Sequence, residues 1–167
     1  MKNRNLIAIL AGVCLYGFTC TSYAVDLFIK ADGIEGSSLD ANHEKWSDAT
    51  ALSGNISLGI CGSLMLEKPL DRASLKYVEK AFSGEVIPKI EIEYVETIVG
   101  ERVTVAKIEF RNGYIAEVAI SNTDSPLSEV LTIASEEIKM THFEYSNDGN
   151  LKGKTETFLT CPQKVKK

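Results

Sequence analysis

The chain has 167 residues and a formal net charge of −5, and 44% of its residues are hydrophobic. Lys and Arg gather only in the short tail at 164–167, so the sequence predicts no nucleic-acid partner. One apolar run, at 6–18, is about 13 residues long, whereas a membrane-spanning helix needs roughly 20.

Residues 1–24 have the pattern of a secretory signal peptide. Lys2 and Arg4 precede the apolar run, and Ser22-Tyr23-Ala24 places small residues at the two positions that a signal peptidase inspects. We therefore predict cleavage between Ala24 and Val25 and a periplasmic or secreted destination. The remaining 167 − 24 = 143 residues form one domain, with no membrane segment and enough chain for a substantial core.

Two alternatives to a cleaved signal peptide stay open. A membrane anchor would need a longer apolar run than the one present. Lipidation of Cys20 would need a Leu and a small residue upstream, and Gly17-Phe18-Thr19 does not supply that pattern.

Two segments near the start of the exported chain have strand patterns. Residues 25–31 alternate in polarity except at Phe28, which predicts a strand with both faces partly covered. Residues 46–58 have a weaker pattern that Ser53-Gly54-Asn55 interrupts. The segment between them reads as turns and an exposed loop.

Residues 71–83 predict the one helix of the chain. Asp71 is placed to cap its first turn, and Gly84 is the residue type that ends a helix in a left-handed conformation. Leu75, Val78 and Phe82 recur at i, i+3 and i+7, so we expect them to form an apolar core stripe that packs against a sheet.

Strands dominate the rest of the sequence. Their expected ranges are 87–98, 102–110, 114–120, 127–134, 138–145 and 154–161, with a hairpin turn at Asn112-Gly113. Short polar turns separate these strands. The fold class that this pattern predicts is mainly β, an antiparallel β-barrel or two-sheet sandwich with one helix on its side.

Two cysteines, Cys61 and Cys161, remain after signal cleavage. Thiols in an oxidising compartment more often pair than stay free, so we predict a disulfide between them. It would close a loop of about 100 residues, for which chain entropy alone corresponds to roughly 4–5 kcal/mol. Two unpaired core cysteines are the alternative.

The sequence predicts no catalytic residue, metal site or cofactor. His43 and His142 are the only side chains that titrate near neutrality without perturbation, and neither has a recognisable catalytic setting. A weak calcium-loop pattern at 144–149 lacks the acidic residue that its twelfth position requires, because Thr155 stands there. Glu91 and Glu93 alternate with apolar residues and predict a solvated strand face.

Three segments resemble the haemolysin-coregulated protein (Hcp) family of type VI secretion systems. They are Ala-Val-Asp-Leu-Phe-Ile-Lys at 24–30, Ser-Leu-Lys-Tyr-Val-Glu-Lys at 74–80, and the run from Leu-Ser-Glu at 127–129 to Phe-Glu-Tyr at 143–145. The resemblance implies a structural, non-enzymatic β-barrel that forms homohexameric rings. Such rings stack into a tube that holds small effector proteins and contacts other components of the secretion system.

Two features depart from that family. Typical members carry no cleavable signal, and the long Gly-rich loop that many place before the helix is here only Gly59-Ile60-Cys61-Gly62. We therefore expect an exported relative in which ring formation is retained and stacking is less supported. The alternatives are a periplasmic or secreted binding module on the same barrel, and a hydrolase, which would need a cleft with convergent polar groups.

Overall fold

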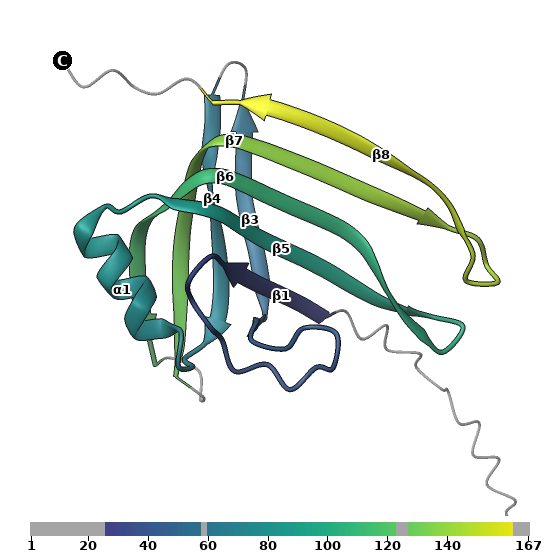
Figure 1. Ribbon diagram of the computed structural model, residues 1–167, viewed down its shortest axis with the longest axis horizontal. Helices are drawn as coiled ribbons and strands as arrows, with labels where there is room; N and C mark the ends of the chain where they lie inside the picture. Colours follow the sequence, from purple (N-terminus) through teal and green to yellow (C-terminus); the bar gives the residue numbers. More distant parts are fainter. Residues whose placement is uncertain (1–25, 58–59, 123–126, 162–167) are drawn as a thin grey trace, which may run out of the picture.

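The protein is described by a computed structural model that covers residues 26–57, 60–122 and 127–161 (Figure 1). The predicted signal peptide and its cleavage site between Ala24 and Val25 lie outside these residues. The described ranges contain one helix, α1 (Ser74–Ser83), and eight strands. The strands are β1 (Asp26–Ala31), β2 (Ser47–Ala49), β3 (Ala51–Ser57), β4 (Ile60–Pro69), β5 (Ile87–Ile98), β6 (Glu101–Ser121), β7 (Ser128–Tyr145) and β8 (Leu151–Thr160).

All eight strands belong to one antiparallel sheet that curls into a barrel. Its order is β2-β1-β5-β6-β7-β4-β3, and β8 pairs with β7 outside this path. The two ends of the order are neighbours in sequence, because only Thr50 separates β2 from β3. The Thr50 backbone N–H donates to the Glu67 carbonyl oxygen of β4 at 2.8 Å. The mainly β barrel with one helix is thus confirmed, as one continuous sheet rather than two.

Four of the predicted strands merge into two long ones. No hairpin forms at Asn112-Gly113, because β6 continues through it and pairs with β7 on both sides, at Arg111–Glu137 and at Gly113–Ser135. The turn signal has a physical basis, since Asn112 does adopt a positive φ of 48°. Gly113 also packs closely, because a Cβ there would lie 3.1 Å from Ile90 Cδ1, so that side chain would have to shift. The expected break near 135–137 is also absent, because β7 pairs with β6 on both sides of it and is continuous.

The Cys61–Cys161 disulfide lies where β7 changes its partner. The first part of β7 pairs with β4, from Ser128 to Ile133, and the last part pairs with β8, from Glu137 to Tyr145. The Cα atoms of the two cysteines are 5.3 Å apart, and the Cys161 N–H donates to the Glu136 carbonyl oxygen at 2.7 Å. The bridge therefore joins β8 end to end with β4 along one edge of β7.

Helix α1 faces the opposite way from the prediction. Leu75 and Phe82 are 76% and 94% exposed and Val78 is 39% exposed, so the expected core stripe faces outward. The buried side of the helix carries Ser74 and Tyr77 instead. Periodicity locates an apolar stripe, but the neighbouring strands decide which side is covered, and here a small residue and an aromatic ring face the core. The helix ends as predicted, with Gly84 in a left-handed conformation at φ 65°.

The main core lies between this buried side of α1 and the inner face of the sheet. It contains Ile29, Leu66, Tyr77, Phe110 and Ile133, each almost completely buried. A second, smaller cluster of Phe28, Trp46 and Val95 lies on the outer face of the sheet. Phe28 therefore breaks the alternation of β1 because both faces of that strand are covered, as its sequence predicted.

Candidate functional site

The last parts of β5 and β7 and the first part of β6 extend beyond the barrel with β8, away from α1 (Figure 1). We call this four-stranded extension the arm; it comprises residues 91–98, 101–109, 138–145 and 151–159. Its outer face carries a series of charged side chains that we call the charge ladder. These are Glu91, Glu93, Lys107, Glu109, Lys139 and Glu156, each paired with an opposite charge.

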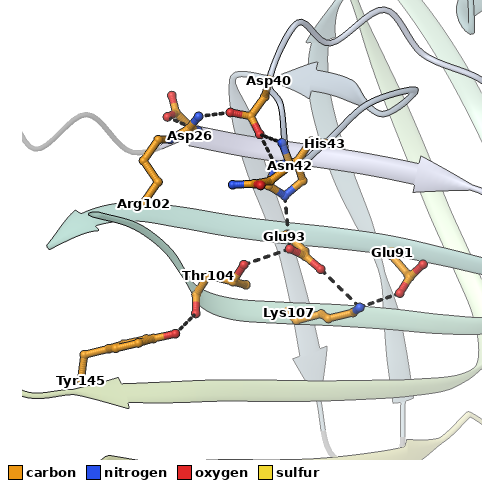
Figure 2. A network of polar contacts seen from close by, with 10 residues as sticks. All are labelled: Asp26, Asp40, Asn42, His43, Glu91, Glu93, Arg102, Thr104, Lys107 and Tyr145. Carbon is orange, nitrogen blue, oxygen red and sulfur yellow. Dashed lines mark hydrogen bonds and ion pairs between the residues drawn. The ribbon is translucent and has the colours of Figure 1, made fainter. Parts of the chain in front are cut away.

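Lys107 connects two carboxylates at the centre of the ladder. Its Nζ lies 2.6 Å from Glu91 Oε1 and 3.3 Å from Glu93 Oε1 (Figure 2). Lys89 Nζ lies 2.9 Å from the other Glu91 oxygen. Glu91 is only 7% exposed. The prediction that Glu91 and Glu93 form a solvated face was therefore wrong. Alternation shows that they share a face, but lysines from neighbouring positions and the packing around them remove Glu91 from water.

The pairing changes the protonation of both partners. Burial acts to raise the pKa of Glu91, but hydrogen bonds from Lys107 and Lys89, together with their charges, outweigh it and hold the pKa below its ordinary value. Burial likewise acts to lower the pKa of Lys107, and the hydrogen bond and charge of Glu91, with a further contribution from Glu93, raise it instead. Both groups are thus held in their charged forms.

His43 lies at the end of the ladder between two carboxylates. Its Nδ1 is 2.6 Å from Asp40 Oδ1, and its Nε2 is 3.2 Å from Glu93 Oε2 (Figure 2). The imidazole stacks on Phe28 with ring centroids 3.9 Å apart and meets Trp46 edge to face. These contacts fix the loop before β2 against the outer face of β1 and β5.

Three further groups extend this network toward the start of the chain and the arm. Arg102 bonds Asp40 and lies 2.7 Å from Asp26 Oδ2, so it joins the loop, β1 and β6. Thr104 Oγ1 donates to Glu93 Oε2 at 3.0 Å, and the Tyr145 hydroxyl donates to the Thr104 carbonyl oxygen at 3.2 Å (Figure 2). Side chains from four strands, β1, β5, β6 and β7, and one loop are therefore held in one arrangement.

The geometry of the network suits positioning rather than chemistry. Each of its carboxylates accepts from a cation or another donor, and the His43 ring contacts two carboxylates and two aromatic rings in the described part of the chain. His142 does not contribute, because it lies on the other face of the sheet, where it is exposed. Within the described ranges, no three His, Cys, Asp or Glu side chains are placed to hold a metal ion. The open hollow beside Arg102, of about 430 Å³, is lined by Asp26, Asp40 and Asp48 together with Phe28 and Leu39.

A second polar group is fully buried between the barrel and α1, and sequence reasoning missed it. Lys68 Nζ lies 2.8 Å from Glu129 Oε1 and 2.9 Å from Asp71 Oδ1, and the Ser74 hydroxyl donates to the same Glu129 oxygen at 2.8 Å. Lys68 and Glu129 are direct cross-strand partners on β4 and β7. Asp71 also accepts from the Ala73 N–H at 2.9 Å, which orders the approach to the helix. The prediction that Asp71 caps a helix beginning at 71 was wrong, because α1 begins at Ser74 with Ala73 as its N-cap and no side chain caps it.

The predicted site residues therefore fall into separate places. The structure joins Cys61 to Cys161, and it puts Leu75, Val78 and Phe82 on the outside of the helix. The polar groups around His43 and Lys68 come together only in the fold. In the sequence, the strand members of these groups stand out only as charged residues within an apolar strand pattern. That pattern does not reveal which residue will be the partner.

No helix in the described part of the chain has the length and hydrophobicity to cross a bilayer. The fold defines a class: a curled antiparallel barrel with one flanking helix and an extended four-stranded arm. Residues 28–142 match the family described as "Type VI secretion system effector, Hcp". The chain belongs to the Hcp family of type VI secretion, as its sequence suggested. No curated protein matches it significantly.

Solved structures share the fold at low sequence identity. Hcp1 from Salmonella typhimurium is 23% identical with a TM-score of 0.71, and the match covers 82% of this chain and 94% of that one. A structure described as a type six secretion system protein is 22% identical with a TM-score of 0.72, over 82% and 96% of the two chains. A type VI secretion system effector from Yersinia pestis is 20% identical with a TM-score of 0.70, over 81% and 99%.

Proposed function

We propose that this protein is exported and that its mature form is a structural subunit of a ring of the type VI secretion kind. The lumen of that ring carries or conducts small effector proteins. The observation that carries the proposal is the outward apolar stripe of α1, in a chain that belongs to the Hcp family. A helix with Leu75 and Phe82 in water has a surface that a partner would cover favourably. A homohexamer, in which every copy covers its neighbour, satisfies all copies at once.

The polar networks support a structural role. They hold the loop before β2, the arm and the approach to α1 in fixed positions, and their charged groups are occupied by one another. A subunit that transmits force or forms a wall needs such fixed surfaces. The disulfide has the same effect, because it fastens the last strand of the described chain to β4.

The oligomeric state tests the assembly proposal. The protein would be purified from the periplasm and its mass measured by light scattering during size-exclusion chromatography. A mass six times that of the mature chain is expected. A single-chain mass across the concentration range would contradict the ring and favour a monomeric binding module on the same barrel.

Export is tested separately, because it depends on residues 1–24. N-terminal sequencing of protein from the periplasm or medium is expected to begin at Val25. A lipidated Cys20 would replace the cleaved signal by a membrane anchor, and full-length protein confined to the cytoplasm would remove export altogether.

A further inference from the structure

The two faces of the arm are not covered as in an ordinary exposed sheet. The arm's charged outer face is well covered on β5 to β7, with Glu91 at 7% exposure, although Phe158 of the same face on the edge strand β8 is 66% exposed. Its other face continues the inner face of the barrel, yet Tyr94 and Met140 on it are 38% and 37% exposed. A sheet that only had to be soluble would expose the charges and cover the tyrosine and methionine.

Strand register defines the residues of that inner face. Tyr94 lies opposite Ala106, which lies opposite His142 and then Thr155; in the next row Ile108 lies opposite Met140 and then Thr157. Cross-strand partners share a face, and so do residues two apart on one strand. We call this set the neutral face, because no Asp, Glu, Lys or Arg occurs in either row. Its members are Tyr94, Ala106, Ile108, Met140, His142, Thr155 and Thr157.

The α1 stripe has matching properties. Leu75, Val78 and Phe82 are apolar and project outward. The charges beside them are already paired within the same copy, Lys76 with Glu79 at 2.7 Å and Lys80 with Glu85. Covering the stripe would therefore leave no charge without its partner, which removes the largest cost of burying a surface.

The stripe and the neutral face cannot meet within one molecule. Along the longest axis of the protein, α1 lies at one end and the arm extends toward the other (Figure 1). We propose that the helix stripe of one copy packs against the neutral face of the arm of the next copy. This inference rests on the proposed ring and identifies its contact surfaces. Each copy would use each surface once, in a head-to-tail contact that can close into a ring.

A helix-to-helix contact between two copies explains the observations less well. It would cover the stripe but leave Tyr94 and Met140 exposed on every arm. The head-to-tail contact covers both surfaces; the residues of the stripe and of the neutral face are uncharged, and Glu96 and Glu144 lie beyond the two rows, nearer the end of the arm.

The experiment uses two variants that each place a charge in one surface, Phe82→Glu and Met140→Glu. Leu39→Glu is the matched control, because Leu39 is 99% exposed and belongs to neither surface. All three would be purified from the periplasm with the wild-type protein, and circular dichroism would establish that each is folded. The masses of the single proteins and of an equimolar mixture of the first two are then measured by light scattering.

The wild type and Leu39→Glu are expected at ring mass, and Phe82→Glu and Met140→Glu each at the mass of one chain. Their mixture is expected to form a one-to-one dimer and nothing larger, because the pair retains one intact stripe and one intact neutral face for each other. The inference is overturned if either variant keeps the ring mass, or if the mixture stays at single-chain mass while the wild type assembles. A single-chain wild type would overturn the proposed function itself, and with it this contact.

Discussion

The barrel end and the arm of this protein are stabilised in different ways. In the barrel, apolar side chains such as Leu66 and Ile133 are buried completely, and the bent segment around Thr50 joins the two ends of the sheet. In the arm, the charge ladder is well covered on β5 to β7, while Tyr94 and Met140 on the opposite face are 38% and 37% exposed. The barrel has the interior of a self-sufficient domain, whereas the arm is an extension whose neutral face is only partly covered by the described part of the chain.

This difference separates stability from assembly. Changes within the barrel and its buried ion pair should unfold the monomer, because they act on groups that the chain itself has removed from water. Changes at Leu75 and Phe82 on the outward stripe of α1 should leave the monomer intact, because these side chains are 76% and 94% exposed.

The largest expected effect is at the buried ion pair. Lys68→Met removes the cation beside Glu129, and both side chains are completely buried, so the carboxylate is left without its partner. We expect the free energy of unfolding to fall by about 3–5 kcal/mol in urea titrations. Adding Glu129→Gln to the same chain should restore much of it, and a double variant less stable than Lys68→Met alone would contradict this.

Next is the disulfide at the junction of barrel and arm. Cys161→Ala frees the end of β8 from the start of β4, 100 positions away in sequence. A loss of about 2–5 kcal/mol in unfolding free energy is expected. As a control, both proteins are also unfolded under reducing conditions. Wild type and Cys161→Ala should then have similar unfolding midpoints, because neither contains the bridge. A thiol count of two on the denatured, unreduced wild type would show that the bridge does not form.

The charge ladder predicts a pH-dependent contribution. Glu91→Gln should cost about 1–3 kcal/mol at pH 7, since charged hydrogen bonds from Lys107 and Lys89 are weakened. The pKa of Glu91 is lowered in the folded state, so its contribution is present above its ordinary value of 4.5 and is lost as the pH falls below it.

Lys107 sets the opposite limit. Its pKa is raised in the folded state, so its contribution is full below its ordinary value of 10.5 and is lost as the pH rises above it.

The acid limit is measured on Glu91. The difference in unfolding free energy between wild type and Glu91→Gln, measured from pH 3 to 7, should shrink toward the acid end. The exposed pair variant Glu79→Gln is the control, with a difference of about 0.5 kcal/mol or less. If the difference in unfolding free energy between wild type and Glu91→Gln stayed constant with pH, the charged form of Glu91 would not stabilise the fold as we expect.

The smallest effect is expected on the helix. Leu75→Asp should change the unfolding free energy of the monomer by no more than about 0.5 kcal/mol, because Leu75 is 76% exposed. Tyr77→Ala on the buried side should cost several times more, since that ring is 1% exposed. Equal midpoints for the two variants in chemical denaturation would place both side chains in the same environment, against the structure.

Much of the fold could be predicted from the sequence because it depends on local chemistry. The strand at 87–98 and the helix end at Gly84 follow from polarity patterns and from a backbone conformation that few residues adopt. The long strands could not, because Asn112-Gly113 has the same signal in a hairpin turn as in an irregular position within β6. Only the continuous pairing with β7 distinguishes the two.

The sequence by itself determined that this is a mainly β chain with one amphipathic helix, and it predicted a cleaved export signal and a disulfide between Cys61 and Cys161. The tertiary structure alone decided which side of α1 is buried, that Lys68 meets Glu129, and that His43 lies between Asp40 and Glu93. The physical reason is that periodicity describes one element at a time. Burial and charge pairing depend on which other elements approach it, and those contacts join residues that are tens of positions apart.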